Sequence, residues 1–380
     1  MPPFAEVRSW MFDAALPFWG NAGVDRTRGG FFEELDLAGR PTDVPFKRTR
    51  VTCRQIYSFS HGALLGWKDG LELSGYGYDY LIDKAWLGPD DGWAKRLSPD
   101  GVVIDSTADL YDLAFVLFAL AWRYRASGDR EALVYAHKTL DFIDKHMRPD
   151  DGEGFMHIRP MKGPRDQNPH MHLTEACLAA FEASGDERFL DTAREIVGLF
   201  RRNFFNGKTL AETFTNDLKR APHANEKIEP GHQFEWAWIL AQYQNLARDD
   251  MHADVRALVE FAESNGVDPT SQFTYMQVSE AGGVTDGSSR TWPNCERIKG
   301  HLALFELGGH DPVPAVTSAA RILLDRFLAV DPRGSWIDHF DAEGRAASKA
   351  VPASTLYHVF LALAELLRME PKLAPSGVQP

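Results

Sequence analysis

Residues 170–203 read HMHLTEACLAAFEASGDERFLDTAREIVGLFRRN, and they contain the pattern that recurs along the chain. Apolar side chains recur at three- and four-residue spacing on both sides of Ser184-Gly185-Asp186, which predicts helices over 170–184 and 187–203. Glycine commonly ends a helix, and aspartate commonly caps the next one. Because so short a connection makes neighbouring helices antiparallel, the stretch predicts a helical hairpin with a tight turn.

The same hairpin pattern recurs along the whole chain. Similar turns occur at Ser127-Gly128-Asp129, at Arg248-Asp249-Asp250 and at 308–312. The other helices predicted from this periodicity are 3–18, 53–68, 71–86, 108–127, 130–147, 231–248, 251–265, 292–307, 313–329 and 353–370. One hairpin per about 60 residues, repeated six times, predicts an all-α (α/α)6 barrel, since ring closure buries the terminal repeats against each other. An open α-solenoid and two unrelated bundles are the alternatives.

The long segments between hairpins contain strand-like pieces with glycine and aspartate, at 30–36, 154–158 and 335–340. They predict short β-ribbons in the long loops at one end of the barrel. Long ordered loops in a compact domain are usually functional. No low-complexity linker interrupts the sequence, so we expect one domain over residues 1–380.

Composition narrows the classes of partner. The formal net charge of -13 disfavours nucleic acid and anionic lipid as partners. The three cysteines, Cys53, Cys177 and Cys295, are far apart, which predicts a reduced cytoplasmic chain without disulfides or a thiolate zinc site. The sequence shows neither a signal peptide nor a stretch of about 18 apolar residues, so no membrane association is expected. A homodimer is left open.

Polar and aromatic residues gather at the starts of the six helices that follow long loops. These segments are 52–59, 106–112, 168–175, 229–236, 290–296 and 352–358. In a ring of parallel inner helices, all six N-terminal ends open at one mouth, where free N–H groups and the positive dipole ends favour sugar oxygens or an oxyanion. The segments therefore predict a single pocket.

Several of these polar and aromatic residues are three or four positions apart, so they share a helix face. The pairs are His232 with Glu235, Arg54 with Tyr57, His172 with Glu175, and Trp292 with Glu296. Together they supply aromatic faces for C–H surfaces and charged groups for hydroxyl pairs. This mixture is what a carbohydrate site needs.

Three segments carry a more specific pattern: EPGHQFEW at 229–236, RQIYSF at 54–59 and NPHMHLTE at 168–175. They resemble motifs of the N-acylglucosamine 2-epimerase superfamily, which includes cellobiose 2-epimerases, mannose isomerases and sulfoquinovose isomerases. STLYH at 354–358 and WPNCE at 292–296 are more similar to the isomerase branch, although Asn294 and Cys295 replace that branch's Gln and Thr. The resemblance runs in order through most of the chain, and it implies the same (α/α)6 barrel.

The resemblance also implies roles for the residues at the mouth. His232 and His358 would be the catalytic acid/base pair, with His358 moving the C1/C2 proton and His232 serving ring opening or the second proton position. Arg54 would stabilise an enediolate, and Glu235 would orient His232 or bind hydroxyls. The residues expected to bind or polarise the sugar, or to complete the lining, are His172, Glu175, Glu296, Asp109, Trp292 and Tyr57.

The activity implied is a metal-independent aldose–ketose isomerase that converts D-mannose to D-fructose, and D-lyxose to D-xylulose, through a cis-enediolate. A 2-epimerase of the N-acylglucosamine or cellobiose type remains the first alternative, because the same two histidines serve either reaction. A glycoside hydrolase built on Glu175, Glu235 and Glu296 and a non-catalytic sugar-binding protein are further alternatives.

We expect no metal or cofactor. His170 and His172 face apart on a helix, no H-E-x-x-H occurs, and no glycine-rich nucleotide motif occurs. The basic residues Lys47, Arg48, Arg50 and Lys349 leave open whether the sugar is phosphorylated or sulfonated.

Overall fold

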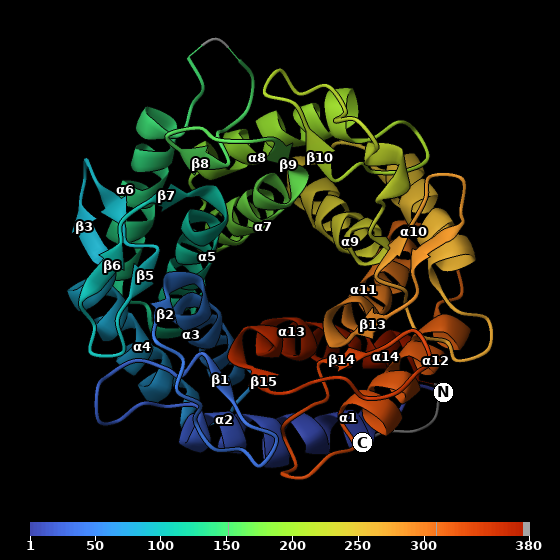
Figure 1. Ribbon diagram of the computed structural model, residues 1–380, viewed down its shortest axis with the longest axis horizontal. Coiled ribbons are helices and arrows are strands. Elements are labelled where there is room, and N and C mark those ends of the chain that lie inside the picture. The colour runs from blue at the N-terminus through green and yellow to red at the C-terminus, as the bar shows by residue number, and fades with distance from the viewer. Residues whose placement is uncertain (151, 309, 375–380) are drawn as a thin grey trace.

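The computed structural model describes residues 1–150, 152–308 and 310–374. Two concentric rings of helices surround a central axis (Figure 1). The inner ring consists of α3 (Thr49–Leu64), α5 (Leu110–Ser127), α7 (Gln167–Ser184), α9 (Pro230–Ala247), α11 (Thr291–Gly308) and α13 (Leu356–Arg368). The outer ring consists of α1 (Phe4–Ser9), α2 (Leu16–Ala22), α4 (Gly70–Ala85), α6 (Arg130–His146), α8 (Glu187–Leu199), α10 (His252–Gly266) and α12 (Val313–Ile322). The predicted (α/α)6 barrel is confirmed.

The tight turns form as their residues predict. Gly128 and Gly185 adopt left-handed backbone angles, with φ of 72° and 73°, where a side chain would be strained. Asp129 accepts a hydrogen bond from the backbone N–H of Glu131, and Asp186 accepts one from Arg188. Each turn therefore ends an inner helix and caps the outer helix that follows. Gly309, which belongs to a predicted turn, lies outside the described residues.

Closure of the ring joins the two ends of the chain. Trp19 of α2 stacks on Trp336 at 4.9 Å between ring centroids, and its indole N–H donates to the carbonyl of Gly334 at 3.1 Å. In the inner ring, the side-chain amide of Gln55 donates to the carbonyl of Ala353 at 2.8 Å. Since the first and last helices pack on each other, the open solenoid is excluded.

Helix boundaries differ from the predictions mainly at irregular turns. Three helices continue through π-helical turns at Trp10–Ala15, Phe200–Phe204 and Leu323–Phe327. The helix predicted over 353–370 begins with a 3-10 turn at Ala353–Thr355, and the helix predicted over 53–68 lies about four residues earlier. A further 3-10 turn covers Ala224–Glu226, and a short helix, α14, covers Glu370–Leu373.

Short antiparallel ribbons occupy the long loops, as predicted (Figure 1). Most ribbons join the loop of one hairpin to the loop of the next, so they tie neighbouring repeats together at the mouth. One sheet has three strands in the order β2 (Lys47–Arg48), β5 (Arg96–Leu97) and β6 (Val103–Asp105). The two-stranded ribbons are β1 (Glu34–Leu35) with β15 (Val351–Pro352), β3 (Trp86–Gly88) with β4 (Gly92–Trp93), β7 (Ala108–Asp109) with β8 (Ile158–Arg159), β9 (Arg165–Asp166) with β10 (Thr213–Phe214), β11 (Gln277–Val278) with β12 (Val284–Asp286), and β13 (Ser289–Arg290) with β14 (His339–Phe340).

Within the described ranges, no helix combines the length and apolar character needed to cross a membrane.

Candidate active site

A cavity of about 330 Å³ opens where the inner helices begin. All six inner repeats contribute to its wall, which confirms that separated helix starts converge on one mouth. The side chains that line it include Arg54, Tyr111, Asn168, His172, Glu229, His232, Glu235, Met276, Arg290, Trp292 and His358. Of the residues predicted for the site, Arg54, His172, His232, Glu235, Trp292 and His358 therefore share this cavity.

His232 begins α9, directly after Pro230 and Gly231, and its side chain is buried. Its Nδ1 lies 2.8 Å from the Glu212 carboxylate and 3.5 Å from that of Glu229. Burial disfavours the charged ring, but these two carboxylates outweigh burial and raise the pKa of His232 to about 10. His232 is therefore an imidazolium at neutral pH, which suits a proton donor. The structure pairs it with Glu212 rather than with Glu235.

His358 has the opposite electrostatic environment. Burial, together with the positive charges of Arg54 and Lys299, lowers the pKa of His358 well below its usual value. Its Nδ1 lies 2.8 Å from Glu296, so Nε2 is the nitrogen available to a substrate. A neutral imidazole held in this way suits a general base. Two titratable groups with pKa values pushed apart are a common arrangement of acid and base.

Trp292 lies beside both histidines. Its ring centroid is 5.0 Å from that of His232 and 5.7 Å from that of His358. Since the indole also lines the cavity, it offers an apolar surface between the proton donor and the base. The C–H face of a sugar ring would fit such a surface.

Arg54 is a buried cation with no carboxylate within 4 Å among the described residues. Its guanidinium donates to the Tyr111 hydroxyl at 2.6 Å and to the carbonyl of Ser354 at 3.1 Å, and it lies 4.2 Å from the centre of the Phe115 ring. Arg290, the other arginine on the cavity wall, is bonded to Asp338 at 2.5 Å. Arg54 is therefore the arginine whose charge remains available to an oxyanion.

Carboxylates support the remaining part of the site. Glu175 accepts hydrogen bonds from His172 Nδ1 at 3.1 Å and from the Tyr357 hydroxyl at 2.6 Å, so it lies behind His172. Glu296 is fully buried behind His358 and contacts Lys299 at 2.7 Å. Burial and the neighbouring Glu235 charge raise the pKa of Glu296. Sequence reasoning assigned Glu175 and Glu296 to the sugar, whereas the structure places both in contact with a histidine.

Two predicted lining residues lie outside the cavity. Tyr57 is fully buried one turn deeper in α3, where its hydroxyl bonds to His61 Nδ1 at 3.0 Å. Asp109 caps α5 by accepting the Tyr111 backbone N–H, and it pairs with Lys95 at 2.7 Å. Both residues therefore support neighbouring side chains instead of facing the cavity.

Glu212, Lys299 and Tyr111 also belong to the site, although no sequence pattern assigned them to it. Tyr111 belongs to a segment already noted for its polar and aromatic residues, and it begins α5. Glu212 lies in the loop before β10, where no helical spacing points to it. Lys299 is one turn after Glu296 on α11 and is completely buried, although a lysine side chain is normally exposed to solvent.

We expect Glu212→Gln to shift the pH profile of the reaction. The wild-type chain should lose activity as pH rises toward about 10, where His232 loses its proton. Removing the Glu212 charge lowers the pKa of His232, so this basic limb of kcat should move down by about one to two pH units. The exposed Glu226→Gln serves as the control, and an unmoved basic limb would show that Glu212 does not hold the proton on His232.

Three sets of described residues place ligand-type atoms within 4.8 Å of one another: His172, Glu175 and Glu235; Glu212, Glu229 and His232; and Glu235, Glu296 and His358. In each set a carboxylate already bonds the histidine Nδ1. The Lys299 ammonium and the His232 imidazolium also repel a cation there. The donor sets therefore fit a hydrogen-bonded network better than a metal.

We accordingly expect activity to be unchanged after treatment with EDTA and dialysis into metal-free buffer. Turnover of the treated chain is compared with that of an untreated sample. Loss of activity that a single divalent ion restores would contradict this expectation.

Comparison with known proteins places this geometry in a family. The model of the N-acylglucosamine 2-epimerase (GlcNAc 2-epimerase) family matches residues 30–362. The chain belongs to this family. It is 34% identical over 378 residues to a protein of Rhizobium meliloti named mannose-6-phosphate isomerase, with 95% of this chain and 96% of that protein covered. It is 29% identical to the D-mannose isomerase of Thermobifida fusca, with 83% and 86% covered. Family members of these kinds are sugar isomerases and epimerases, so this chain is an enzyme of that class.

Among solved structures, the cellobiose 2-epimerase of Spirochaeta thermophila superposes with a TM-score of 0.87 at 23% identity, covering 98% of this chain and 97% of the other. This likeness concerns the fold. The family membership sets aside the binding-protein and glycoside hydrolase alternatives.

Proposed function

We propose that the chain is an aldose–ketose isomerase that interconverts D-mannose and D-fructose, and also D-lyxose and D-xylulose. The observation that carries this proposal is the pair of histidines on one cavity, with His232 held protonated and His358 held neutral. The names of two relatives, mannose-6-phosphate isomerase and D-mannose isomerase, support mannose stereochemistry.

The reaction then divides between these residues. His232 donates a proton to the ring oxygen and takes up the proton that the O1 hydroxyl loses, which opens the sugar and restores the imidazolium. His358 Nε2 removes the proton from C2, and Arg54 stabilises the negative charge that develops on O1 of the cis-enediolate. His358 returns the proton to C1 while the O2 proton passes to O1, so the aldose becomes a ketose without an external reactant.

The opposed pKa shifts favour isomerisation over 2-epimerisation. An epimerase needs bases on both faces of the planar intermediate, whereas an isomerase can use one base on one face. His232 carries its proton at neutral pH, because Glu212 and Glu229 raise its pKa. It is therefore a poor second base.

The charges around the mouth support a free sugar rather than a phosphorylated one. Lys47 is bonded to Asp25 at 2.8 Å, Arg48 to Glu33 at 2.6 Å, and Arg50 to Asp112 at 3.3 Å. These carboxylates neutralise three of the basic residues that, in the sequence, left open whether the sugar is phosphorylated or sulfonated. A phosphate near them would face the carboxylates as well.

We expect kcat/KM for D-mannose to exceed that for D-mannose 6-phosphate by about tenfold or more. Both substrates are assayed with the same preparation, by following the appearance of ketose. A preference for the phosphate ester would keep the proton-transfer chemistry but overturn the choice of substrate.

A further inference from the structure

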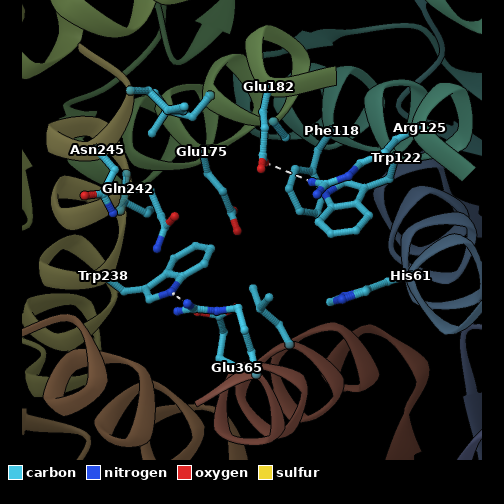
Figure 2. A pocket seen from close by; sticks show the side chains of 16 residues that line it. His61, Phe118, Trp122, Arg125, Glu175, Glu182, Trp238, Gln242, Asn245 and Glu365 are labelled. Atoms are coloured by element: carbon cyan, nitrogen blue, oxygen red, sulfur yellow. Dashed lines mark hydrogen bonds and ion pairs between the residues drawn. The ribbon is translucent and has the colours of Figure 1, made fainter. Parts of the chain in front are cut away.

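A second cavity lies at the opposite end of the barrel, where the inner helices end (Figure 2). Its volume is about 320 Å³, close to the 330 Å³ of the active-site cavity. The proposed catalytic steps use none of its outer lining. A ligand of monosaccharide size therefore fits this distal cavity as well as it fits the mouth.

The floor of the distal cavity is the Glu175 carboxylate. Glu175 points toward the centre of the cavity in Figure 2, and its carboxylate also contacts His172, which lines the mouth. The two cavities therefore share one wall. Glu175 offers a buried acceptor to a ligand hydroxyl from the distal side.

Neutral hydrogen-bonding groups surround this acceptor. Burial lowers the pKa of His61 to about 3, so its ring is neutral, and its Nδ1 is hydrogen-bonded to the Tyr57 hydroxyl at 3.0 Å, which leaves Nε2 for a ligand. The buried Trp122 indole N–H has no hydrogen-bond partner among the described residues. Among the described residues, the side-chain amides of Gln242 and Asn245 also have no hydrogen-bond partner. His61, Trp122, Gln242 and Asn245 thus supply both donors and acceptors without adding charge.

The charged residues at the rim are already paired. Arg125 is bonded to Glu182 at 2.9 Å, and Arg368 is bonded to Glu365 at 2.8 Å. An anion would meet three carboxylates, because Glu175 lies below these two pairs.

An organic cation would find the aromatic rings occupied. Arg125 lies 5.0 Å from the centre of the Trp122 ring, and Lys299 lies 4.4 Å from that of Trp238. The His61 ring also lies against Trp122, at 4.4 Å between ring centroids, whereas no aromatic ring among the described residues packs on Trp238, so the Trp238 indole is the surface that remains for a neutral C–H face.

We propose that the distal cavity is a second binding site, which takes a neutral monosaccharide with its C–H face on Trp238, beside Trp122, and with its hydroxyls on Glu175 and Gln242. This inference goes beyond the proposed function, and it does not depend on which sugar reacts.

The test uses fluorine NMR on the full chain carrying 5-fluorotryptophan and His358→Asn, which slows turnover. Trp122→Phe and Trp292→Phe assign the resonances that report on the distal cavity and on the mouth. D-Mannose is the probe, and sodium phosphate and choline are tested in parallel. We expect the Trp122 resonance to shift saturably with D-mannose and not with the two ions.

Gln242→Leu should weaken the Trp122 midpoint by about tenfold and leave the Trp292 midpoint unchanged, since it removes hydrogen bonds from the distal cavity alone. The exposed Asn21→Leu on α2 is the matched control and should change neither. A Trp122 resonance that stays still, or that follows Trp292 with the same midpoint and ignores Gln242→Leu, would overturn the proposal. A shift with choline or phosphate but not with mannose would overturn it too.

The two proposals fail separately. A Trp292 shift without a Trp122 shift rejects the distal site and leaves the proposed function intact. A Trp122 shift without a Trp292 shift supports the distal site and rejects D-mannose as the ligand of the mouth.

Discussion

The His358→Asn variant should lose about 10²–10⁴ of wild-type kcat on D-mannose while it keeps its fold. Asparagine can still bond to Glu296, but it cannot accept the C2 proton. The neighbouring rings of Trp292 and Tyr357 would keep their positions, because the substituted side chain is smaller than imidazole. Steady-state kinetics and thermal unfolding of the same preparation measure both effects.

His223→Asn is the matched control for this substitution. His223 is exposed and adopts a left-handed backbone conformation, with φ of 62°, which asparagine tolerates well. Its activity should equal that of the wild type. If His358→Asn kept more than about a tenth of wild-type kcat, its role as the general base would be rejected.

The Arg54→Gln variant should reduce kcat by about 10²–10³, with a smaller change in KM. The guanidinium is expected to act mainly on the charge that develops in the enediolate, so its loss affects the transition state more than the bound sugar. Kinetics with D-mannose separate the two parameters.

Arg54→Lys distinguishes charge from packing. Lysine keeps a cation above the Phe115 ring but cannot make the paired contacts with Tyr111 and Ser354, so it should recover part of the lost rate. Equal losses in both variants, accompanied by a lower melting temperature, would show that Arg54 is a structural residue.

The ring could be predicted from the sequence because the residues at each turn specify that turn by themselves. The Gly-Asp turns at 128–129 and 185–186 fix where one helix ends and the next begins, and the helix starts between them carry the polar residues. Convergence of these starts follows from the geometry of a closed ring alone. This explains why six of the ten predicted site residues share the mouth cavity.

The partners of the two histidines could not be predicted in the same way. Glu212 contacts His232 from a different loop, and Glu296 contacts His358 from the neighbouring helix. No regular spacing in the sequence therefore indicates either contact. Tyr57 was misplaced for a related reason. It shares a helix face with Arg54, but that face passes from the cavity into the core within one turn.

In the proposed mechanism, His358 carries a proton between C2 and C1 of D-mannose through a cis-enediolate. The most direct measurement follows D-mannose with the enzyme in D₂O by ¹H NMR. We expect D-fructose as the first product, with deuterium partly incorporated at the carbon that receives the proton. Glucose formed before any fructose would make the chain a 2-epimerase. Complete conversion in D₂O that leaves no deuterium on any carbon would contradict proton transfer by His358.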